Sequence, residues 1–315
     1  MRAIRVHRFG DPEVLQIEEV PKPAPGPGQV LVRLGAAGVN PVETYMRSGN
    51  YANLPDLPYT PGGDGAGDVE AVGEDVLDLR PGDRVYVTQS ATYAEYCVAD
   101  ASNVYPLGGR TSYAQGAALG VPYVTALYAL QRIGARAGDW LLVRGASGGV
   151  GVAALQLARA RGILAVGTAG SEEGLELVRA QGARAAVAHE DGDGARAATG
   201  GRGFDLVIDN AAHVGLGKDI ELLAPGGRIA VIGARAPVEV HPRGLMTMQG
   251  SIHGILLFRA DPADLRRVNL ELCAGLRDGA LQPVIGRSFP LAQAAQAHHA
   301  QHAPGARGKI VLTID

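Results

Sequence analysis

The segment 141–157, Leu-Leu-Val-Arg-Gly-Ala-Ser-Gly-Gly-Val-Gly-Val-Ala-Ala-Leu-Gln-Leu, constrains the fold more than any other part of this 315-residue chain. An apolar run is followed by a glycine-rich turn and then by a stretch with helical periodicity. Read as Ala146-x-Gly148-x-x-Gly151, the turn has the spacing of a dinucleotide-binding fingerprint, with alanine in the first position. Gly148 lets the backbone approach a pyrophosphate, and Gly151 lets the helix pack closely on the strand. The N-terminus of that helix offers N–H groups and a positive dipole end to the phosphates.

The sequence around this turn alternates between strands and helices. Alternation of this kind predicts a Rossmann-type, doubly wound parallel sheet and so an α/β fold. A turn that is merely glycine-rich is the alternative, and its position between an apolar strand and a helix argues against it. The predicted strands are 140–144, 163–168, 184–187, 205–209, 227–232 and 251–257, and helices are expected at 150–161 and 172–181.

The first third of the chain reads as β-rich, with short strands and no intervening helix, which indicates a barrel or sandwich. A capping box, Ser112 with Gln115, opens a helix, and a second helix follows Pro122. The last strand, Lys309–Ile314, lies too far downstream for the nucleotide sheet, so we expect it to rejoin the first domain. The predicted domains are therefore a β-rich catalytic domain over 1–122 and 264–315 and a dinucleotide-binding domain over 123–263. The strands expected early in the chain are 4–9, 14–18, 29–37, 67–72 and 84–88, and the late helices are 262–277 and 291–302.

Composition excludes several classes of protein. Apolar residues make up 46% and charged residues 19%, which rules out disorder as the dominant state. The net charge of −3 offers no electrostatic footprint for nucleic acid or an acidic membrane surface. No apolar run approaches about 18 residues, so membrane insertion is not expected. The N-terminus alternates like a strand and lacks a signal-peptide core, so we expect a soluble, cytoplasmic protein.

The residues after the second strand of the sheet indicate which cofactor is bound. An NAD site places Asp or Glu at the end of that strand, where the carboxylate binds the ribose 2′-hydroxyl. Here the strand is followed by Ala169, Gly170 and Ser171, and Glu172 and Glu173 read as acids of a first helical turn. This absence favours NADPH. His189, after the third strand, is either a polar contact near the adenosine or a solvated loop residue.

The chain lacks the residues that a zinc-dependent alcohol dehydrogenase of this architecture uses as ligands. The segment 38–41 contains no cysteine, and the segment 61–67 contains no histidine. Cys97, in an apolar strand, reads as a buried thiol. His298 and His302 have the i, i+4 spacing of a metal pair, but exposed histidines on an alanine-rich helix are the favoured interpretation. The sequence therefore predicts no metal, and its substrate must not need Lewis-acid polarisation.

Several segments, in the same order over essentially the whole chain, resemble the zinc-free quinone oxidoreductases, the zeta-crystallin-like members of the medium-chain dehydrogenase/reductase superfamily. These segments are Phe9–Leu15, Gly38–Gly49, Tyr59–Gly62 with Gly67–Gly73, Gly145–Gly151, Gly167–Gly170 with Glu172–Gly174, and Pro283–Gly286.

The resemblance implies a GroES-like catalytic domain beside the Rossmann domain and NADPH-dependent reduction of a quinone in the cleft between the two domains. It implies that Asn40, Tyr45, Tyr51 and Thr125 lie near the nicotinamide and substrate, with Tyr51 and Thr125 also touching the cofactor. The other cofactor contacts that it implies are Ser147, Gly148, Gly149, Val150, Gly170, His189, Val231, Ile232, Gly233, Ala234, Ile255, Leu256 and Leu257.

The resemblance also implies a homodimer or homotetramer, often formed by pairing edge strands of the nucleotide domain, for which Ser251–Phe258 is the candidate. The sequence departs from the family at two places. Gly174 lies about where some bacterial relatives carry a lysine that holds the 2′-phosphate. The stretch Val87–Tyr93 is shorter than usual.

The chemistry expected of such a site is simple. A quinone that accepts a hydride becomes a hydroquinone oxyanion that solvent protonates readily, so the protein mainly positions the ring and donates hydrogen bonds to the developing charge. The amide of Asn40 and the phenols of Tyr45 and Tyr51 are suitable donors, although an asparagine before proline often only forms a turn and tyrosines often only pack. We expect no dedicated general base. The alternatives are reduction of a 2-alkenal or enone, one-electron reduction of a quinone, and an NADPH-binding structural or regulatory protein.

Overall fold

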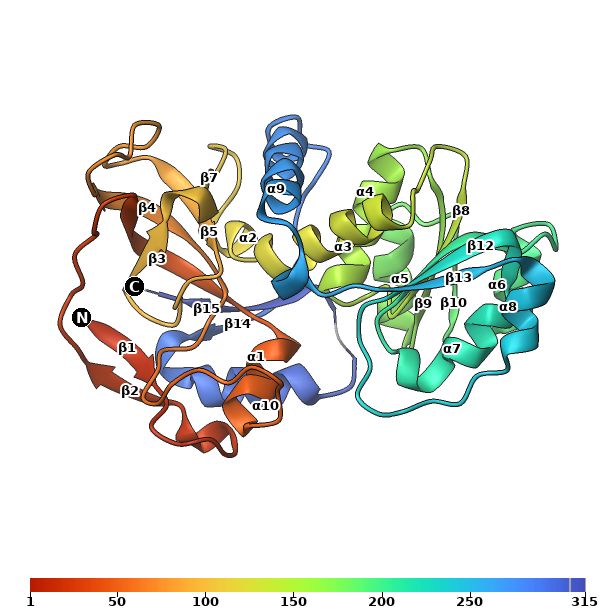
Figure 1. The fold of residues 1–315 in the computed structure, drawn as a ribbon, viewed down its shortest axis with the longest axis horizontal. Helices are drawn as coiled ribbons and strands as arrows, with labels where there is room; N and C mark the ends of the chain where they lie inside the picture. Colours follow the sequence, from red (N-terminus) through yellow and green to blue (C-terminus); the bar gives the residue numbers. More distant parts are fainter. Residues whose placement is uncertain (306, 315) are drawn as a thin grey trace. The chain divides into compact units, whose positions relative to one another are not determined.

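A computed structural model describes residues 1–305 and 307–314 of the chain. The chain divides into two compact units, the first formed by 1–121 with 269–315 and the second by 122–268. The first unit is thus discontinuous in sequence, with the second inserted between its parts (Figure 1). Each unit has a sheet of its own.

The second unit is built on a six-stranded sheet in the order β10-β9-β8-β11-β12-β13. All five pairings are parallel, as the alternating sequence predicts for a Rossmann-type sheet. The strand order reverses between β8 and β11, which is the switch point where ligands of such sheets bind. The strands are β8 (Trp140–Arg144), β9 (Leu164–Ala169), β10 (Ala185–Ala188), β11 (Phe204–Asp209), β12 (Leu223–Val231) and β13 (Ser251–Gly254).

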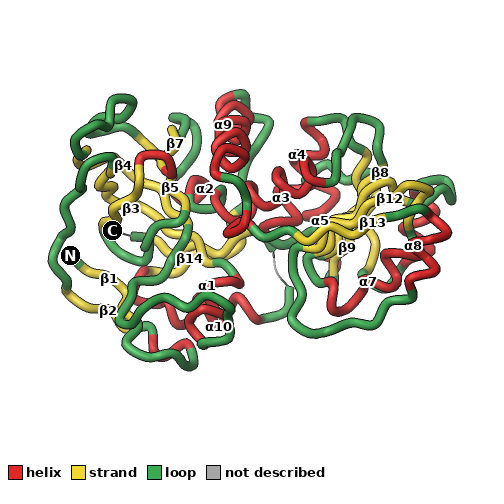
Figure 2. The backbone as a smooth tube through the Cα atoms, viewed as in Figure 1, coloured by secondary structure: helices red, strands yellow, loops and turns green. Residues whose placement is uncertain are grey.

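Helices flank this sheet (Figure 2). Their apolar side chains pack against the strands and contribute to a core that includes Leu142, Val166 and Phe204, each 0% exposed. The helices of this unit are α4 (Gly149–Ala160), α5 (Glu172–Ala180), α6 (Gly192–Ala198), α7 (Ala212–Glu221) and α8 (Pro242–Met248), while α3 (Gly120–Arg132) and α9 (Pro262–Arg277) cross the boundaries between the units.

The first unit contains a seven-stranded sheet in the order β14-β15-β3-β4-β5-β7, with β6 also paired to β3. Strand β3 is long because one edge serves two partners: Gln29–Arg33 pair with β6, and Ala36–Val39 pair with β15. The C-terminal strand therefore rejoins the first unit, as predicted. The strands are β1 (Arg2–Arg5), β2 (Gln16–Glu19), β3 (Gln29–Val39), β4 (Asp64–Val72), β5 (Arg84–Thr88), β6 (Tyr96–Asp100), β7 (Val104–Pro106), β14 (Ile285–Pro290) and β15 (Lys309–Thr313).

The expectation of a helix-free first third was wrong, because α1 (Pro41–Ser48) follows β3 directly. Proline at the first helical position has a suitable φ and lacks an N–H that would need a partner there, so Asn40-Pro41 starts a helix rather than a turn. The predicted capping box of Ser112 and Gln115 is present and opens α2 (Tyr113–Gly116). The alanine-rich helix predicted near the C-terminus is α10 (Ala294–His302).

Three predicted strands are shorter than expected. The first ends at Arg5, and Val6 adds only a single bridge to Tyr59. The second starts after a 3₁₀ turn, Pro12–Val14, and the edge strand β13 ends at Gly254. In each case a turn or 3₁₀ segment replaces part of an apolar run, which periodicity alone does not distinguish from a strand. The other 3₁₀ turns are Ala101–Asn103, Leu257–Arg259 and Leu291–Gln293. Among the described residues, no helix combines the length and the apolar character that crossing a membrane requires.

Candidate active site

The fingerprint turn has the geometry that a close approach of backbone requires. Gly145 adopts a φ of +64°, and Gly148 caps α4 with an extended backbone. A Cβ on Gly151 would lie 2.4 Å from the Cα of Ala146, so only glycine allows the helix to start this close to the strand. The turn is tied to β9, because Ala146 donates its N–H to the carbonyl of Thr168 at 2.8 Å. The first N–H groups of α4 are thereby held at the carboxyl end of β8, where they have no partner within the helix.

The structure brings the predicted nucleotide-binding residues to one edge of the parallel sheet, the edge formed by the carboxyl ends of its strands. Residues 147–150 follow β8, Gly170 follows β9, and His189 follows β10. Val231 ends β12 and residues 232–234 follow it. Ile255 continues β13 by donating its N–H to the carbonyl of Val231 at 3.0 Å. Leu256 lies after this strand and is 49% exposed, and Leu257 starts the following 3₁₀ turn.

A pocket of about 480 Å³ lies at the ends of β9 and β10. Gly170 and His189 face each other there, because a Cβ on the glycine would lie 3.3 Å from the imidazole. The Nδ1 atom of His189 lies 2.8 Å from the hydroxyl of Thr168, which holds the imidazole at the pocket although the residue is exposed. Glu172 and Glu173 stand in the first turn of α5, as predicted. The lining residues are Ala169, Gly170, Ser171, Glu172, Leu175, Ala188, His189 and Glu190.

A buried ion pair between Arg144 and Asp219 contacts the backbone of the pocket at His189. Arg144, the last residue of β8, donates from Nε to Asp219 of α7 at 2.6 Å and from Nη1 to the carbonyl of His189 at 2.8 Å. Burial raises the pKa of Asp219 and the carboxylate of Asp209 raises it further, whereas Arg144 lowers it. Burial and the same guanidinium lower the pKa of His189, so its imidazole is neutral at physiological pH.

The predicted substrate residues are divided between the two units. Asn40, Tyr45 and Tyr51 belong to the first unit, at the start of α1, within it and in the loop after it. Thr125 belongs to α3 in the second unit and is 5% exposed. Tyr45 and Tyr51 are half-buried. Burial raises the pKa of Tyr51, which keeps its phenol protonated and able to donate a hydrogen bond.

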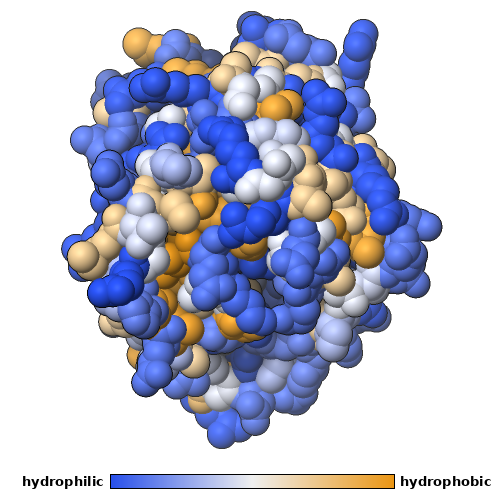
Figure 3. Space-filling model, turned by 90° about the vertical axis from the view of Figure 1, so that its right-hand side faces the viewer, coloured by the Kyte–Doolittle hydropathy of each residue, from blue (hydrophilic) through white to orange (hydrophobic). Residues whose placement is uncertain are grey.

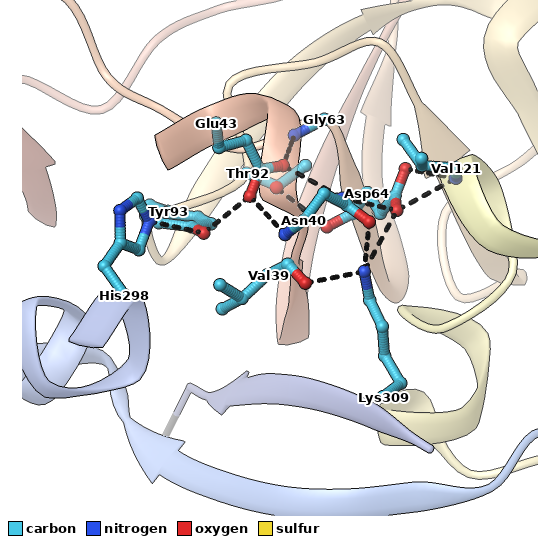
Figure 4. A network of polar contacts seen from close by, with 10 residues as sticks. All are labelled: Val39, Asn40, Glu43, Gly63, Asp64, Thr92, Tyr93, Val121, His298 and Lys309. Atoms are coloured by element: carbon cyan, nitrogen blue, oxygen red, sulfur yellow. Dashed lines mark hydrogen bonds and ion pairs between the residues drawn. The ribbon is translucent and has the colours of Figure 1, made fainter. Parts of the chain in front are cut away.

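Asn40 is the centre of a buried polar network (Figure 4). Its Nδ2 donates to Glu43 at 3.0 Å and to Asp64 at 2.9 Å, and its backbone N–H donates to Glu43 at 2.8 Å. Its Oδ1 accepts a hydrogen bond from the ammonium of Lys309. Both hydrogens of the amide are therefore committed within the protein, and Asn40 is 1% exposed. This geometry contradicts its expected use as a donor to a quinone, and it makes Asn40 a residue that holds the start of α1.

Asp64 and Lys309 carry the charges at one end of this network. Asp64 accepts the N–H of Val121, near the start of α3, at 3.0 Å from both carboxylate oxygens. Lys309 donates to the carbonyl of Val39 at 2.8 Å, and its Nζ lies 3.9 Å from Asp64. Burial raises the pKa of Asp64 to about 6, although the Lys309 ammonium lowers it. Burial likewise lowers the pKa of Lys309. The cluster thus connects the starts of two helices, α1 and α3.

The other end of the network corrects the interpretation of His298. It is 0% exposed, and its Nε2 lies 3.1 Å from the hydroxyl of Tyr93, which donates to Glu43 at 2.7 Å. Since the Tyr93 hydrogen goes to Glu43, Nε2 of His298 must be the donor to the Tyr93 oxygen. Burial lowers the pKa of His298 to about 3, so it is a neutral core residue and not an exposed one.

Two further findings concern metal sites and thiols. Cys97 is buried, as predicted, and burial raises the pKa of its thiol to about 12. Within 1–305 and 307–314, no group of three or more His, Cys, Asp or Glu side chains is arranged to hold a metal ion.

Sequence reasoning missed the charged members of the buried network, Glu43, Asp64 and Lys309. A signal was present for Lys309, because it is one of only three lysines in the chain and opens an apolar strand. A lysine at the start of such a strand is either exposed at the edge of the sheet or buried in an ion pair, and the sequence alone does not distinguish these two possibilities.

Comparison with known proteins agrees with this architecture. Residues 26–129 match the alcohol dehydrogenase GroES-like domain, and residues 149–274 match the zinc-binding dehydrogenase family. Together, a GroES-like unit and a Rossmann sheet with a fingerprint turn define a medium-chain dehydrogenase/reductase.

Similarity over the whole chain indicates which family of this superfamily the chain belongs to. The chain is 46% identical to the quinone oxidoreductase of Lama guanicoe over 100% of this chain and 98% of the relative. A crystal structure of an NAD-dependent alcohol dehydrogenase superposes with a TM-score of 0.93 at 32% identity, covering 100% of both chains. The Escherichia coli quinone oxidoreductase complexed with NADPH superposes with a TM-score of 0.89 at 26% identity, again over 100% of both. The chain belongs to the quinone oxidoreductase family, a family of oxidoreductase enzymes.

Proposed function

We propose that this enzyme reduces quinones with NADPH and without zinc. The observation that carries the proposal is the edge of the parallel sheet, where the fingerprint turn and the pocket at the ends of β9 and β10 lie together. The similarity to quinone oxidoreductases over the whole chain supports the substrate class.

The residues at this edge fit a dinucleotide. The close contact between Gly151 and Ala146 leaves no room for a side chain, and it places the N-terminus of α4 at the turn as a site for a pyrophosphate. The pocket at the ends of β9 and β10 fits the adenosine ribose. Strand β9 ends at Ala169 without an acid, which favours the 2′-phosphate of NADPH over the bare ribose of NADH.

NADPH, when bound, supplies a hydride from C4 of its nicotinamide. The protein's part is then to orient the quinone and to donate hydrogen bonds to the oxygen on which charge develops. We assign this role to the phenols of Tyr45 and Tyr51, since Asn40 has no hydrogen left to donate. Loss of one donor to a developing oxyanion lowers kcat by about a hundredfold to a thousandfold. We expect a smaller loss, about tenfold, for Tyr51→Phe, because solvent can protonate a hydroquinone oxyanion readily.

Zinc independence rests on the side chains in the two segments that lack a zinc-binding cysteine or histidine, 38–41 and 61–67, which contain Asn40 and Asp64. In place of a cysteine, Asn40 is bonded to Glu43, Asp64 and Lys309. A buried ammonium at 2.8 Å from the carbonyl of Val39 disfavours a second cation in the same place by charge repulsion.

Steady-state oxidation of NADPH in the presence of 1,2-naphthoquinone or 9,10-phenanthrenequinone tests the reaction, with 2-alkenals as comparison substrates. We expect turnover with the quinones, unchanged after treatment with a chelator, and tighter binding of NADPH than of NADH in fluorescence titrations. Turnover of 2-alkenals alone would contradict the substrate class. Loss of activity with a chelator and its recovery with zinc would contradict the metal-free chemistry.

We also propose that the protein forms a homodimer or homotetramer through the free edge of β13. Ile252 on this strand is 37% exposed, and Leu256 and Phe258 just after it are each 49% exposed. Figure 3 shows apolar side chains at the surface between polar ones on the side of the second unit. Light scattering during size-exclusion chromatography tests the proposal, and Ile252→Glu should shift the protein toward the monomer. A wild-type monomer at micromolar concentration would contradict it.

A further inference from the structure

The pocket at the ends of β9 and β10 contains two carboxylates, although the cofactor proposed for it carries a negatively charged 2′-phosphate. Glu172 and Glu190 both line it, and none of its lining residues among those described is a lysine or arginine. His189 adds no positive charge, since it is neutral at physiological pH. Without compensation, such a pocket would repel a phosphate that carries a charge of about −1.5 to −2.

Each of the two carboxylates has a cationic partner that stands outside the pocket lining. Glu172 pairs at 2.9 Å with Arg179, which lies about two helical turns further along the same helix, α5. Glu190 pairs with Lys218, which comes from a different element, α7. The Lys218 ammonium lowers the pKa of Glu190 and neutralises its charge at the pocket.

The position of Lys218 is set by the fold and not by the flexible pair alone. Its neighbour in the chain, Asp219, is 0% exposed and holds Arg144, which in turn donates to the backbone carbonyl of His189. Helix α7 is therefore attached to the segment 189–190 twice, once through this buried chain of contacts and once through Lys218 itself. These contacts fix the backbone of α7 beside the segment 189–190, and from there the 61% exposed side chain of Lys218 reaches Glu190.

We propose that Lys218 is a specificity-determining residue of this enzyme: by binding Glu190, it cancels the charge that would otherwise turn the ribose pocket into one that prefers NADH. The proposal rests on the function proposed above. A Glu190 carboxylate without its lysine partner should change the affinities for the two cofactors in opposite directions. It repels the 2′-phosphate of NADPH, and it can accept a hydrogen bond from the ribose hydroxyl of NADH, as the acid of an NAD site does.

The experiment measures the dissociation constants of NADPH and NADH by fluorescence titration at low ionic strength, where surface charges act over the longest range. The variants are Lys218→Met, Glu190→Gln and the double variant. Lys22→Met is the matched control, because Lys22 forms a comparable exposed pair with Glu70 at 2.5 Å in the other unit.

We expect Lys218→Met to weaken NADPH binding by about three- to tenfold, because the unpaired carboxylate of Glu190 then repels the 2′-phosphate through solvent. NADH binding should stay the same or become tighter. The double variant should recover NADPH binding, since it has the same summed charge as the native pair, and Lys22→Met should change neither cofactor.

Equal changes for both cofactors in Lys218→Met, no change for either, or failure of the double variant to recover would overturn the proposal. If Lys218→Met does not fold, the Glu190→Gln variant tests the proposal. This substitution frees the Lys218 ammonium to bind the phosphate, so it should tighten the binding of NADPH and leave that of NADH unchanged. Unchanged NADPH binding in Glu190→Gln would overturn the proposal. A wild-type protein that binds NADH as tightly as NADPH would instead refute the cofactor assignment, whatever the variants do.

Discussion

Replacing Lys309 by methionine tests the account of the buried network through its pH dependence. Burial raises the pKa of Asp64 to about 6, against the lowering effect of the ammonium 3.9 Å away. Without that ammonium the pKa of Asp64 rises further. Below about pH 6 the carboxyl is protonated in both folded proteins, so its ionisation adds no difference between them. Above about pH 6 it ionises in the folded wild type, whereas in the folded variant it stays protonated.

The magnitude follows from linkage. An acid that is protonated when folded and ionised when unfolded costs about 1.4 kcal/mol of stability for each unit of rising pH. Between about pH 6 and about pH 8 the deficit of Lys309→Met relative to wild type should therefore grow by up to about 3 kcal/mol. A pH-independent loss of about 1–3 kcal/mol comes in addition, because the carbonyl of Val39 and Oδ1 of Asn40 each lose a buried donor.

Urea unfolding of wild type and Lys309→Met at several pH values measures this growth directly. Lys22→Met serves as the control, and its unfolding midpoint should match that of the wild type at every pH, since its pair with Glu70 is exposed. A deficit of the same size at low and high pH would refute the reasoning, because the network would then be held by hydrogen bonds and packing without a contribution from the charge of Asp64.

Three other changes test separate parts of the structure. Gly151→Ala places a Cβ 2.4 Å from the Cα of Ala146, so it should lower the thermal midpoint by several degrees and weaken NADPH binding in fluorescence titrations; a variant that binds normally would contradict the close approach. Tyr93→Phe removes the hydrogen donated to Glu43 and the acceptor for His298, and should cost about 1–3 kcal/mol in urea unfolding, with an unchanged stability as the contrary result. Because the pKa of His298 is lowered to about 3, its neutral form stabilises the fold above about pH 6.5, and this contribution falls by about 3 kcal/mol as the pH drops to about 4. His298→Asn should lose less stability than wild type over that interval, and an identical acid profile would rule the histidine out as the cause.

Local patterns were enough to predict the second unit. The spacing of glycines in the turn 145–151 predicted a strand before it and a helix after it, and both are present. Apolar runs separated by helical segments predicted the parallel sheet, since each such unit has few ways to bury its apolar side. The return of the C-terminal strand was also predictable, because a strand that follows a completed α/β series must pair elsewhere.

The candidate site was less predictable, and Asn40 shows why. An asparagine before a proline has several possible roles, and only the positions of its partners decide between them. One partner, Lys309, is 269 positions away in the chain. His298 was misjudged for the same reason: its helix is alanine-rich and reads as exposed, yet the imidazole meets Tyr93, which is 205 positions away.

The amino-acid sequence by itself determined the nucleotide-binding edge, because a glycine turn, the strand before it and the helix after it interact within a few residues of one another. The tertiary structure alone decided which charged side chains pair with one another, because it places Lys218 beside Glu190 and Lys309 beside Asp64. A charged group is stabilised or destabilised by whatever lies within a few ångströms, and burial makes those neighbours matter more. Neighbours of that kind come from distant parts of the chain, so their effects on ionisation and stability emerge only when the chain is folded.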